Sequence, residues 1–253
     1  MIDKIWLPYC GEAPAPAEWL TRWNFDPVLL AALALCGVLA ALPLDAWRGV
    51  QGQRRRASAQ TALAIIAVLY LSPLCALSST FFTVRVVHHM ALVLAVAPLL
   101  SFAIAPWIGR AARGVWLWTA GAAALFWLWH SPQAYSAALS SDGVYWVMQL
   151  TLLASAVGFW AAVRRAECGV AIAAVLATTV QMGLLGALIT FSVRPLYPPH
   201  FASTLSWSIS PLVDQQLAGV VMWAPGSFAY LLAAMLIGRQ WLRQGTPMRA
   251  PGA

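Results

Sequence analysis

Residues 80–104 read TFFTVRVVHHMALVLAVAPLLSFAI, an apolar stretch long enough to cross a bilayer as a helix. Its interior carries Arg85, His88 and His89, followed by Met90. An ionisable side chain at membrane depth costs roughly 2.5 kcal/mol or more, so such groups face a partner or a cavity rather than lipid. The stretch therefore predicts a membrane-spanning helix and a function exercised inside the membrane.

The rest of the chain repeats this apolar pattern. Of its 253 residues, 61% are hydrophobic and 9% are charged, and the mean hydropathy is +0.74. Segments of about 17–25 apolar residues span a bilayer as helices, whereas open strands leave backbone groups unpaired in lipid. The predicted spans lie near residues 27–46, 59–77, 80–104, 114–130, 144–163, 169–191 and 215–237. We therefore expect an all-α polytopic membrane protein, a single integral domain (1–253) folded as a bundle of seven transmembrane helices.

The basic residues fall in alternate loops between these spans. Eleven of the 15 Lys and Arg residues lie on one side of the predicted bundle. They are Arg48, Arg54, Arg55, Arg56, Arg110, Arg113, Arg164, Arg165, Arg239, Arg243 and Arg249. Basic loops face the cytoplasm, so we expect the N-terminus outside and the C-terminus in the cytoplasm. The net charge of +7 follows from this bias, and we expect the basic loops to lie against anionic lipid headgroups. The charge therefore indicates no nucleic-acid partner.

Cysteine spacing indicates neither a thioredoxin-like motif nor a zinc ribbon. The cysteines are Cys10, Cys36, Cys75 and Cys168, and no two form a CxxC. Cys10 and Cys75 both fall toward the outer side and can pair, although free cysteines buried in an apolar core are the alternative we favour. Trp and Tyr residues near the span ends, Tyr145 among them, predict an interfacial belt.

Polar and soft side chains gather in the outer half of the predicted membrane. His88 and His89 lie about 13 Å deep at 1.5 Å per residue, and Arg85 lies one turn further out. The same layer receives Met90, His130, Met148, Gln149, Gln181, Met182 and Met222. Imidazole with thioether suits copper, and thioether selects Cu(I), although methionine also fills gaps in helix cores. The layer therefore predicts a copper site.

The orientation of the cluster leaves alternatives open. Adjacent histidines diverge by about 100°, so His88 and His89 bind one ion only where the helix opens locally. Otherwise one faces the site and the other bonds a neighbouring helix. Arg85 argues against a bare cation site. It either pairs with Asp214 or binds an anionic group such as a haem propionate or a lipid phosphate. Asp214, at the start of the last span, is also a candidate N-cap.

Several functional classes lack their sequence features. There is no HExxH, GxSxG or P-loop motif, so catalysis is not expected. The only lysine is Lys4, which excludes a retinal Schiff base in the seventh span. Inverted repeats typical of transporters are not apparent. A small-molecule transporter gated by Arg85 and Asp214 remains the weakest alternative.

Three stretches, 81–98, 127–139 and 186–226, resemble the CtaG family of cytochrome c oxidase assembly proteins. The resembling motifs are His89-Met90 with Ala97-Pro98-Leu99-Leu100, Trp129-His130-Ser131-Pro132-Gln133-Ala134-Tyr135, Gly186-Ala187-Leu188-Ile189-Thr190-Phe191, Pro195-Leu196-Tyr197-Pro198, and Asp214-Gln215-Gln216-Leu217-Ala218-Gly219-Val220-Val221-Met222-Trp223. With the topology, the resemblance covers roughly residues 27–237. It implies a non-enzymatic metallochaperone-like factor of the bacterial cytoplasmic (inner) membrane. Such a factor assists copper delivery to the catalytic subunit of a haem–copper oxidase from the outer side, with a periplasmic copper chaperone as a further partner.

The resemblance implies site residues at His89, Met90, His130, Asp214, Gln215 and Met222, and the ionisable cluster within the span adds His88 and Arg85. The expected metal ligands are His88, His89, Met90, His130 and Met222, and the expected cofactor-binding residues are Arg85, Asp214 and Gln215. The chain departs from the family pattern where Arg85 and Gln149 stand in place of histidines. His88 then restores one imidazole. The alternative reading is a haem-handling protein with a histidine axial ligand and Arg85 on a propionate.

Overall fold

The computed structural model describes residues 8–109 and 114–245. These residues form helices and the segments that connect them, and they contain no strand. The helices are α1 (Pro27–Ala41), α2 (Gly49–Leu71), α3 (Leu74–Thr80), α4 (Phe82–Ala91), α5 (Ala97–Ala103), α6 (Ala105–Ile108), α7 (Val115–His130), α8 (Pro132–Ala138), α9 (Asp142–Val163), α10 (Cys168–Thr190) and α11 (Pro211–Gly245). The all-α prediction is confirmed, and each predicted span falls on one or more of these helices.

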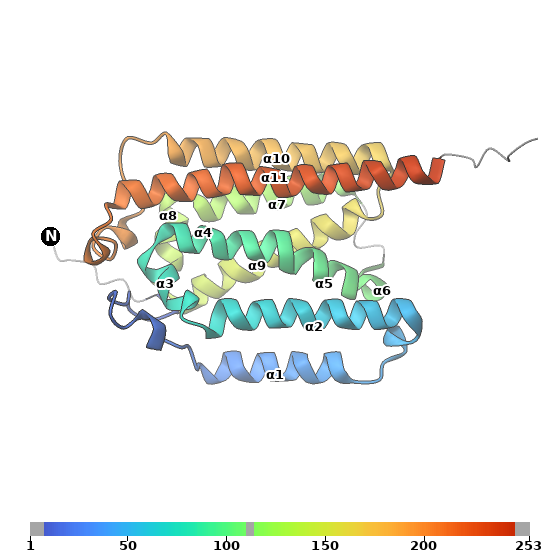
Figure 1. Cartoon of the computed structure of the whole chain (residues 1–253), viewed down its shortest axis with the longest axis horizontal. Coiled ribbons are helices and arrows are strands. Elements are labelled where there is room, and N and C mark those ends of the chain that lie inside the picture. Colours follow the sequence, from blue (N-terminus) through green and yellow to red (C-terminus); the bar gives the residue numbers. More distant parts are fainter. Residues whose placement is uncertain (1–7, 110–113, 246–253) are drawn as a thin grey trace, which may run out of the picture.

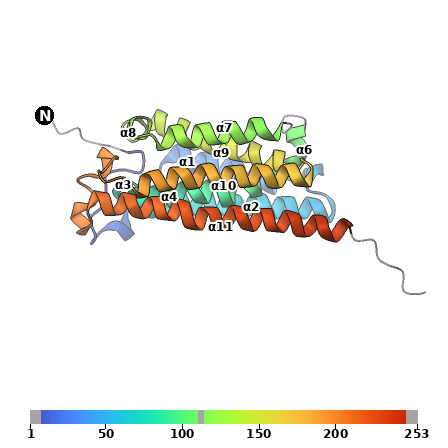
Figure 2. The same ribbon diagram turned by 90° about the horizontal axis from the view of Figure 1, so that it is seen from above.

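The long helices lie side by side along one axis of the molecule (Figures 1 and 2). The α10–α11 pair has the most extensive contact, α7 packs on α9 and α10, and α4 packs on α11. Within residues 8–109 and 114–245, four segments are long and apolar enough to span a membrane, namely Phe82–Ala103, Asp142–Val163, Cys168–Thr190 and Pro211–Arg243. The bent pair α2–α3 makes a fifth if it is counted as one span, whereas α1 has only 15 residues and α7 only 16.

Prolines explain two irregularities that length alone did not predict. The span expected at 59–77 is two helices, because Pro73 has no N–H to continue α2 and α3 turns away by 52°. Residues Leu92–Val96 form a π-helix between α4 and α5, directly before Pro98. Pro98 cannot donate to the Val93 carbonyl, which accepts instead from Trp160 Nε1 at 2.8 Å.

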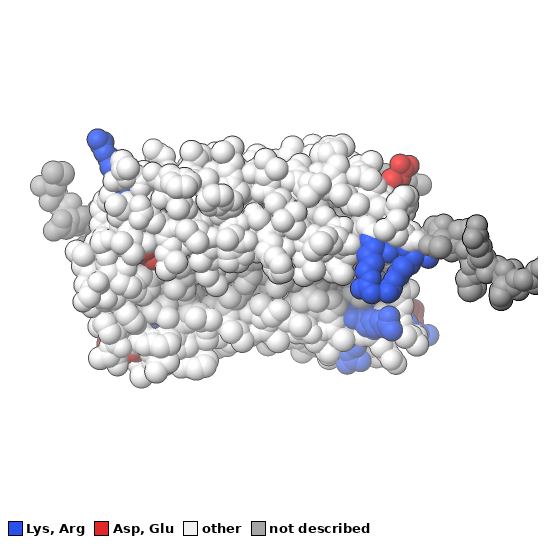
Figure 3. Space-filling view, turned by 45° about the horizontal axis from the view of Figure 1, so that its top comes forward, with Lys and Arg blue, Asp and Glu red and all other residues white. Residues whose placement is uncertain are grey.

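The two ends of the bundle differ in charge (Figure 3). Arginines gather at one end, where α2 begins and where α9 and α11 end, and we call this the basic end. Four residues of the predicted charge bias, Lys4, Arg110, Arg113 and Arg249, lie outside the described residues. At the opposite end the connection between the predicted spans 114–130 and 144–163 contains the short helix α8.

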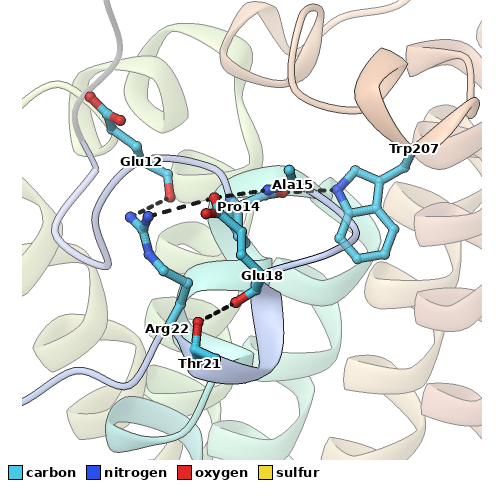
Figure 4. A network of polar contacts seen from close by, with 7 residues as sticks. All are labelled: Glu12, Pro14, Ala15, Glu18, Thr21, Arg22 and Trp207. Atoms are coloured by element: carbon cyan, nitrogen blue, oxygen red, sulfur yellow. Dashed lines mark hydrogen bonds and ion pairs between the residues drawn. The ribbon is translucent and has the colours of Figure 1, made fainter.

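Residues 8–25 fold over this opposite end and form what we call the N-terminal cap. Asn24 N donates to Leu71 O, and Trp207 Nε1 donates to Pro14 O at 3.0 Å (Figure 4). Arg22 contacts Glu18 at 3.8 Å and donates to Glu12 O (Figure 4).

A disulfide between Cys10 and Cys75 fastens the cap to α3, with a Cα–Cα distance of 5.2 Å. Our expectation of two free buried cysteines was therefore wrong. The cap folds back onto α3 through its hydrogen bonds, and that fold brings the two sulfurs together. Cys36 and Cys168 are free.

Candidate functional site

Arg85 is fully buried on α4 and has no acidic partner among the described residues. Its Nη1 donates to Tyr145 Oη at 3.1 Å, and its guanidinium carbon lies 5.1 Å from the centroid of the Tyr145 ring. Its Nε and Nη2 have no hydrogen-bond partner. A guanidinium stays protonated in proteins, and a buried charge without a counter-charge is costly. This end of α4 therefore presents unused donors and uncompensated positive charge.

Asp214 does not pair with Arg85, contrary to one of the predicted alternatives. Its carboxylate accepts from Phe82 N at 2.7 Å and from Thr83 N at 3.2 Å, and Thr83 Oγ1 donates to Asp214 O. These are free N–H groups in the first turn of α4. Asp214 thus caps the neighbouring helix rather than its own, and Ser210 Oγ accepts from Val213 N at the start of α11.

Gln215 has a structural role that occupies its side-chain amide. Its Oε1 accepts from Leu196 N at 2.6 Å, and its Nε2 donates to Ile189 O and Arg194 O. The residue ties the loop after α10 to the start of α11. Both Nε2 donors and one lone pair of Oε1 are thus engaged by the backbone.

His130 is held in one tautomer by the backbone. Its Nδ1 lies 2.7 Å from Phe126 O, which accepts only, so Nδ1 carries the proton. Its Nε2 is buried and has no partner, so a lone pair points into the interior. A histidine that donates one ring N–H to a carbonyl and presents its other nitrogen is the usual arrangement of a metal ligand.

His89 lies against His130, with ring centroids 5.4 Å apart and planes at 85°. Its Nε2 accepts from Gln149 Nε2 at 3.4 Å, and its Nδ1 has no partner. Gln149 Oε1 in turn accepts from Tyr70 Oη at 3.0 Å. Gln149, where the resemblance led us to expect a histidine, is thus in direct contact with His89.

His88 is buried beside Tyr70, with ring centroids 4.6 Å apart, and neither of its ring nitrogens has a partner. It lies 6.4 Å from His89 between ring centroids. Both residues belong to the regular α-helix α4, because the wider π-helical turn begins after them, at Leu92–Val96. They therefore diverge as the regular geometry predicts, and His89 rather than His88 meets His130.

The predicted thioether residues continue one layer toward the basic end. A Cβ at Gly226 would lie 2.5 Å from the methyl carbons of both Met90 and Met182, so these two side chains pack on that glycine. Met222 is fully buried one turn earlier on α11. A small cavity of about 20 Å³ borders this layer and is lined in part by Phe126, Met182 and Tyr230.

Tyr145 is the site residue that the sequence reasoning missed, because it was assigned to the interfacial belt. It is fully buried and lies between Arg85 and the cap. Helical spacing contained the signal: Tyr145, Met148, Gln149 and Leu152 share one face of α9, and all four are buried.

The described residues contain no group of three His, Cys, Asp or Glu side chains that could hold a metal ion. What the structure brings together is one oriented imidazole lone pair, two further histidines with unused nitrogens, and a layer of thioethers. The family model of cytochrome c oxidase caa3 assembly factors (Caa3_CtaG) matches residues 35–244. The chain belongs to this family. Neither the comparison with curated proteins nor the comparison with solved structures gives a match.

The match to the assembly factor family includes the whole histidine and methionine layer. It begins after the N-terminal cap, so Cys10 lies outside the matched residues and Cys75 lies within them.

Proposed function

We propose that this member of the cytochrome c oxidase assembly factor family receives copper as cargo at His89 and His130 and assists its delivery to the catalytic subunit. The proposal is supported by the orphaned buried nitrogens of this pair, above all the oriented Nε2 of His130. Buried polar atoms without a partner are rare and indicate a missing ion, water or ligand. We assign the protein a handling role without turnover chemistry.

Imidazole and thioether are the donors present, and they favour copper over hard cations. His88, Met90 and Met222 extend the donor set as transient ligands on either side of the pair. No carboxylate joins this set, since Asp214 is engaged by the backbone of α4. Copper bound here would be held weakly enough to transfer.

We further propose that seven helices cross the bacterial cytoplasmic membrane with the N-terminus outside. In this arrangement the basic end lies in the cytoplasm and the capped end faces the periplasm. The histidine layer then lies in the outer half of the membrane. Its partners on that side are the oxidase catalytic subunit and a periplasmic copper chaperone.

Copper loading of the purified protein tests the ligand assignment. We expect His89→Ala and His130→Ala to abolish copper that the parent protein retains after desalting. The matched control is His200→Gln, because both nitrogens of His200 are engaged, by Tyr135 Oη and Thr80 O. Unchanged copper in the His89→Ala/His130→Ala double variant would remove the assignment.

Deletion in the native host tests the assembly role itself. We expect loss of cytochrome c oxidase activity while haem synthesis and oxidase transcripts stay normal. Normal oxidase activity in the deletion strain contradicts an assembly role, whatever the purified protein binds.

The small volume of the interior cavity supports the haem alternative less well than the copper proposal. The cavity beside the histidine layer has a volume of about 20 Å³, room for roughly one water, whereas cofactor pockets occupy roughly 300–1,000 Å³. A Soret band in the purified protein is the observation that would favour haem.

A further inference from the structure

The Cys10–Cys75 disulfide lies at the edge of the hydrophobic core, where three polar side chains approach its sulfurs. Tyr145 Oη lies 3.7 Å from Cys10 Sγ, and a disulfide sulfur has no proton, so the hydroxyl donates. Ser78 Oγ lies 3.8 Å from Cys10 Sγ, and Asn24 Nδ2 donates to Cys75 Sγ at 3.9 Å. Donors that surround sulfur stabilise a thiolate more than a neutral disulfide.

The same tyrosine joins the sulfurs to the unpaired arginine. Arg85 Nη1 donates to Tyr145 Oη, which leaves the phenol proton free to point at Cys10. The guanidinium is fully buried and has two nitrogens without acceptors. An anionic centre at the two sulfurs would supply the counter-charge that the described residues do not provide.

We propose that the reduced Cys10–Cys75 pair is a Cu(I) site, formed at the mouth of the histidine layer. A protein dithiol first reduces the disulfide: its two thiols supply two electrons and two protons, the Cys10–Cys75 bond breaks, and the donor becomes a disulfide. Cu(I) then displaces the two cysteine protons and bonds both sulfurs. Soft thiolates select Cu(I), and two thiolates with one Cu(I) carry a net charge of −1 beside Arg85.

The cap controls access to this site. Cys10 and Cys75 are both buried, and Tyr9 stacks on Tyr145 with ring centroids 5.1 Å apart. The disulfide is the covalent cross-link between the described cap and α3. Its reduction removes that cross-link and leaves the cap held by hydrogen bonds and ring packing, which a copper donor displaces to reach the sulfurs.

This inference rests on the proposed copper role but uses different residues, so the two can fail separately. Purified full-length protein is prepared in its oxidised form and after treatment with a trialkylphosphine that is removed anaerobically. Each form is titrated with Cu(I) against a chromogenic Cu(I) chelator. Oxidised protein reports the histidine layer, and we expect reduction to add one copper per chain.

Three double variants show which residues bind the additional copper, called the increment below. Cys10→Ser/Cys75→Ser must lose it, and the matched control Cys36→Ser/Cys168→Ser must keep it, since both of those cysteines are free and distant in sequence from the cap. His89→Ala/His130→Ala must lose the oxidised-form copper and keep the increment. An increment absent from the reduced parent protein, or present in Cys10→Ser/Cys75→Ser, overturns the proposal.

Arg85 provides a readout that a merely structural disulfide would not change. We expect Arg85→Gln to weaken Cu(I) binding to the reduced pair about tenfold or more, because it removes the positive charge that Tyr145 connects to the sulfurs, and Arg85→Lys to weaken it less. Equal affinity in the parent protein and Arg85→Gln contradicts the assignment of Arg85 as counter-charge.

Discussion

At the residue scale, the buried acid and the buried base of this protein have different partners. Asp214 accepts from the backbone of α4, whereas Arg85 donates to a tyrosine and keeps two nitrogens unused. The sequence predicted that both would be important, and pairing with each other was one of the alternatives that it left open. The choice depends on the first turn of α4, which offers N–H groups to the carboxylate, and the sequence pattern does not contain that geometry.

Removal of the Asp214 carboxylate should destabilise the fold. Asp214→Ala leaves the N–H groups of Phe82 and Thr83 without acceptors in the interior, a cost of about 1–3 kcal/mol. The thermal unfolding midpoint in detergent, followed by Trp fluorescence, measures it. Asp142→Ala is the control, because that aspartate is exposed in the first turn of α9 and should cost less than about 1 kcal/mol. Equal shifts in the two variants would contradict the capping role.

His200, in the loop between α10 and α11, should make stability depend on pH. Burial lowers the pKa of its imidazole to about 3, against about 6.5 when unfolded. The neutral form therefore stabilises the fold fully above about pH 6.5, and each pH unit below that removes roughly 1.4 kcal/mol until about pH 3. We expect His200→Gln to be less stable near neutral pH but to lose less stability on acidification. Parallel pH profiles of the unfolding midpoint would show that His200 does not titrate in this way.

At the element scale, the length of the apolar segments predicted where the helices lie. It did not predict where a helix is interrupted or which faces of two helices meet. The predicted spans 144–163 and 169–191 match α9 and α10 closely, because these segments are mostly apolar and carry no charged residue. The bend at Pro73 and the π-helix before Pro98 depend on which backbone carbonyls find substitute donors. Likewise, the meeting of His89 with His130 depends on helix rotation, which residue spacing along one chain does not determine.

Close approach of α10 and α11 should depend on two glycines. A Cβ at Gly219 would lie 2.3 Å from Thr190 Oγ1 and 2.6 Å from Gly186 O, so the helices cannot keep their separation if it is added. We expect Gly219→Ala to cost about 1–3 kcal/mol, measured by the unfolding midpoint. Gly169→Ala, on the same pair of helices, has no atom within 4 Å of the added carbon and should be neutral or slightly stabilising. Destabilisation of both variants to the same degree would argue against tight packing as the cause.

At the scale of the whole molecule, the asymmetry between the basic end and the capped end predicts the orientation in the membrane. Ser140 is exposed at the capped end, before α9, and Gln51 is exposed in the first turn of α2 at the basic end. In a Cys36→Ser/Cys168→Ser background, Ser140→Cys should react with a membrane-impermeant maleimide in spheroplasts. Gln51→Cys should react only after permeabilisation. The reverse pattern would invert the proposed topology and move the histidine layer to the cytoplasmic half.

The π-helix between α4 and α5 divides residues 82–103 into two rotational phases. Its wider turn holds one more residue than an α-helical turn, and one residue corresponds to about 100° of rotation. The face of α4 that carries His89 is therefore not continuous with the face of α5 that would follow it on a single helical wheel. Deletion of one residue between 92 and 96 would consequently leave an ordinary α-helical turn and keep both halves on their present faces, whereas a deletion within α4 or α5 would turn one half by about 100°. In this fold the position of a deletion, within the π-helix or outside it, therefore determines which face each half of the helix presents.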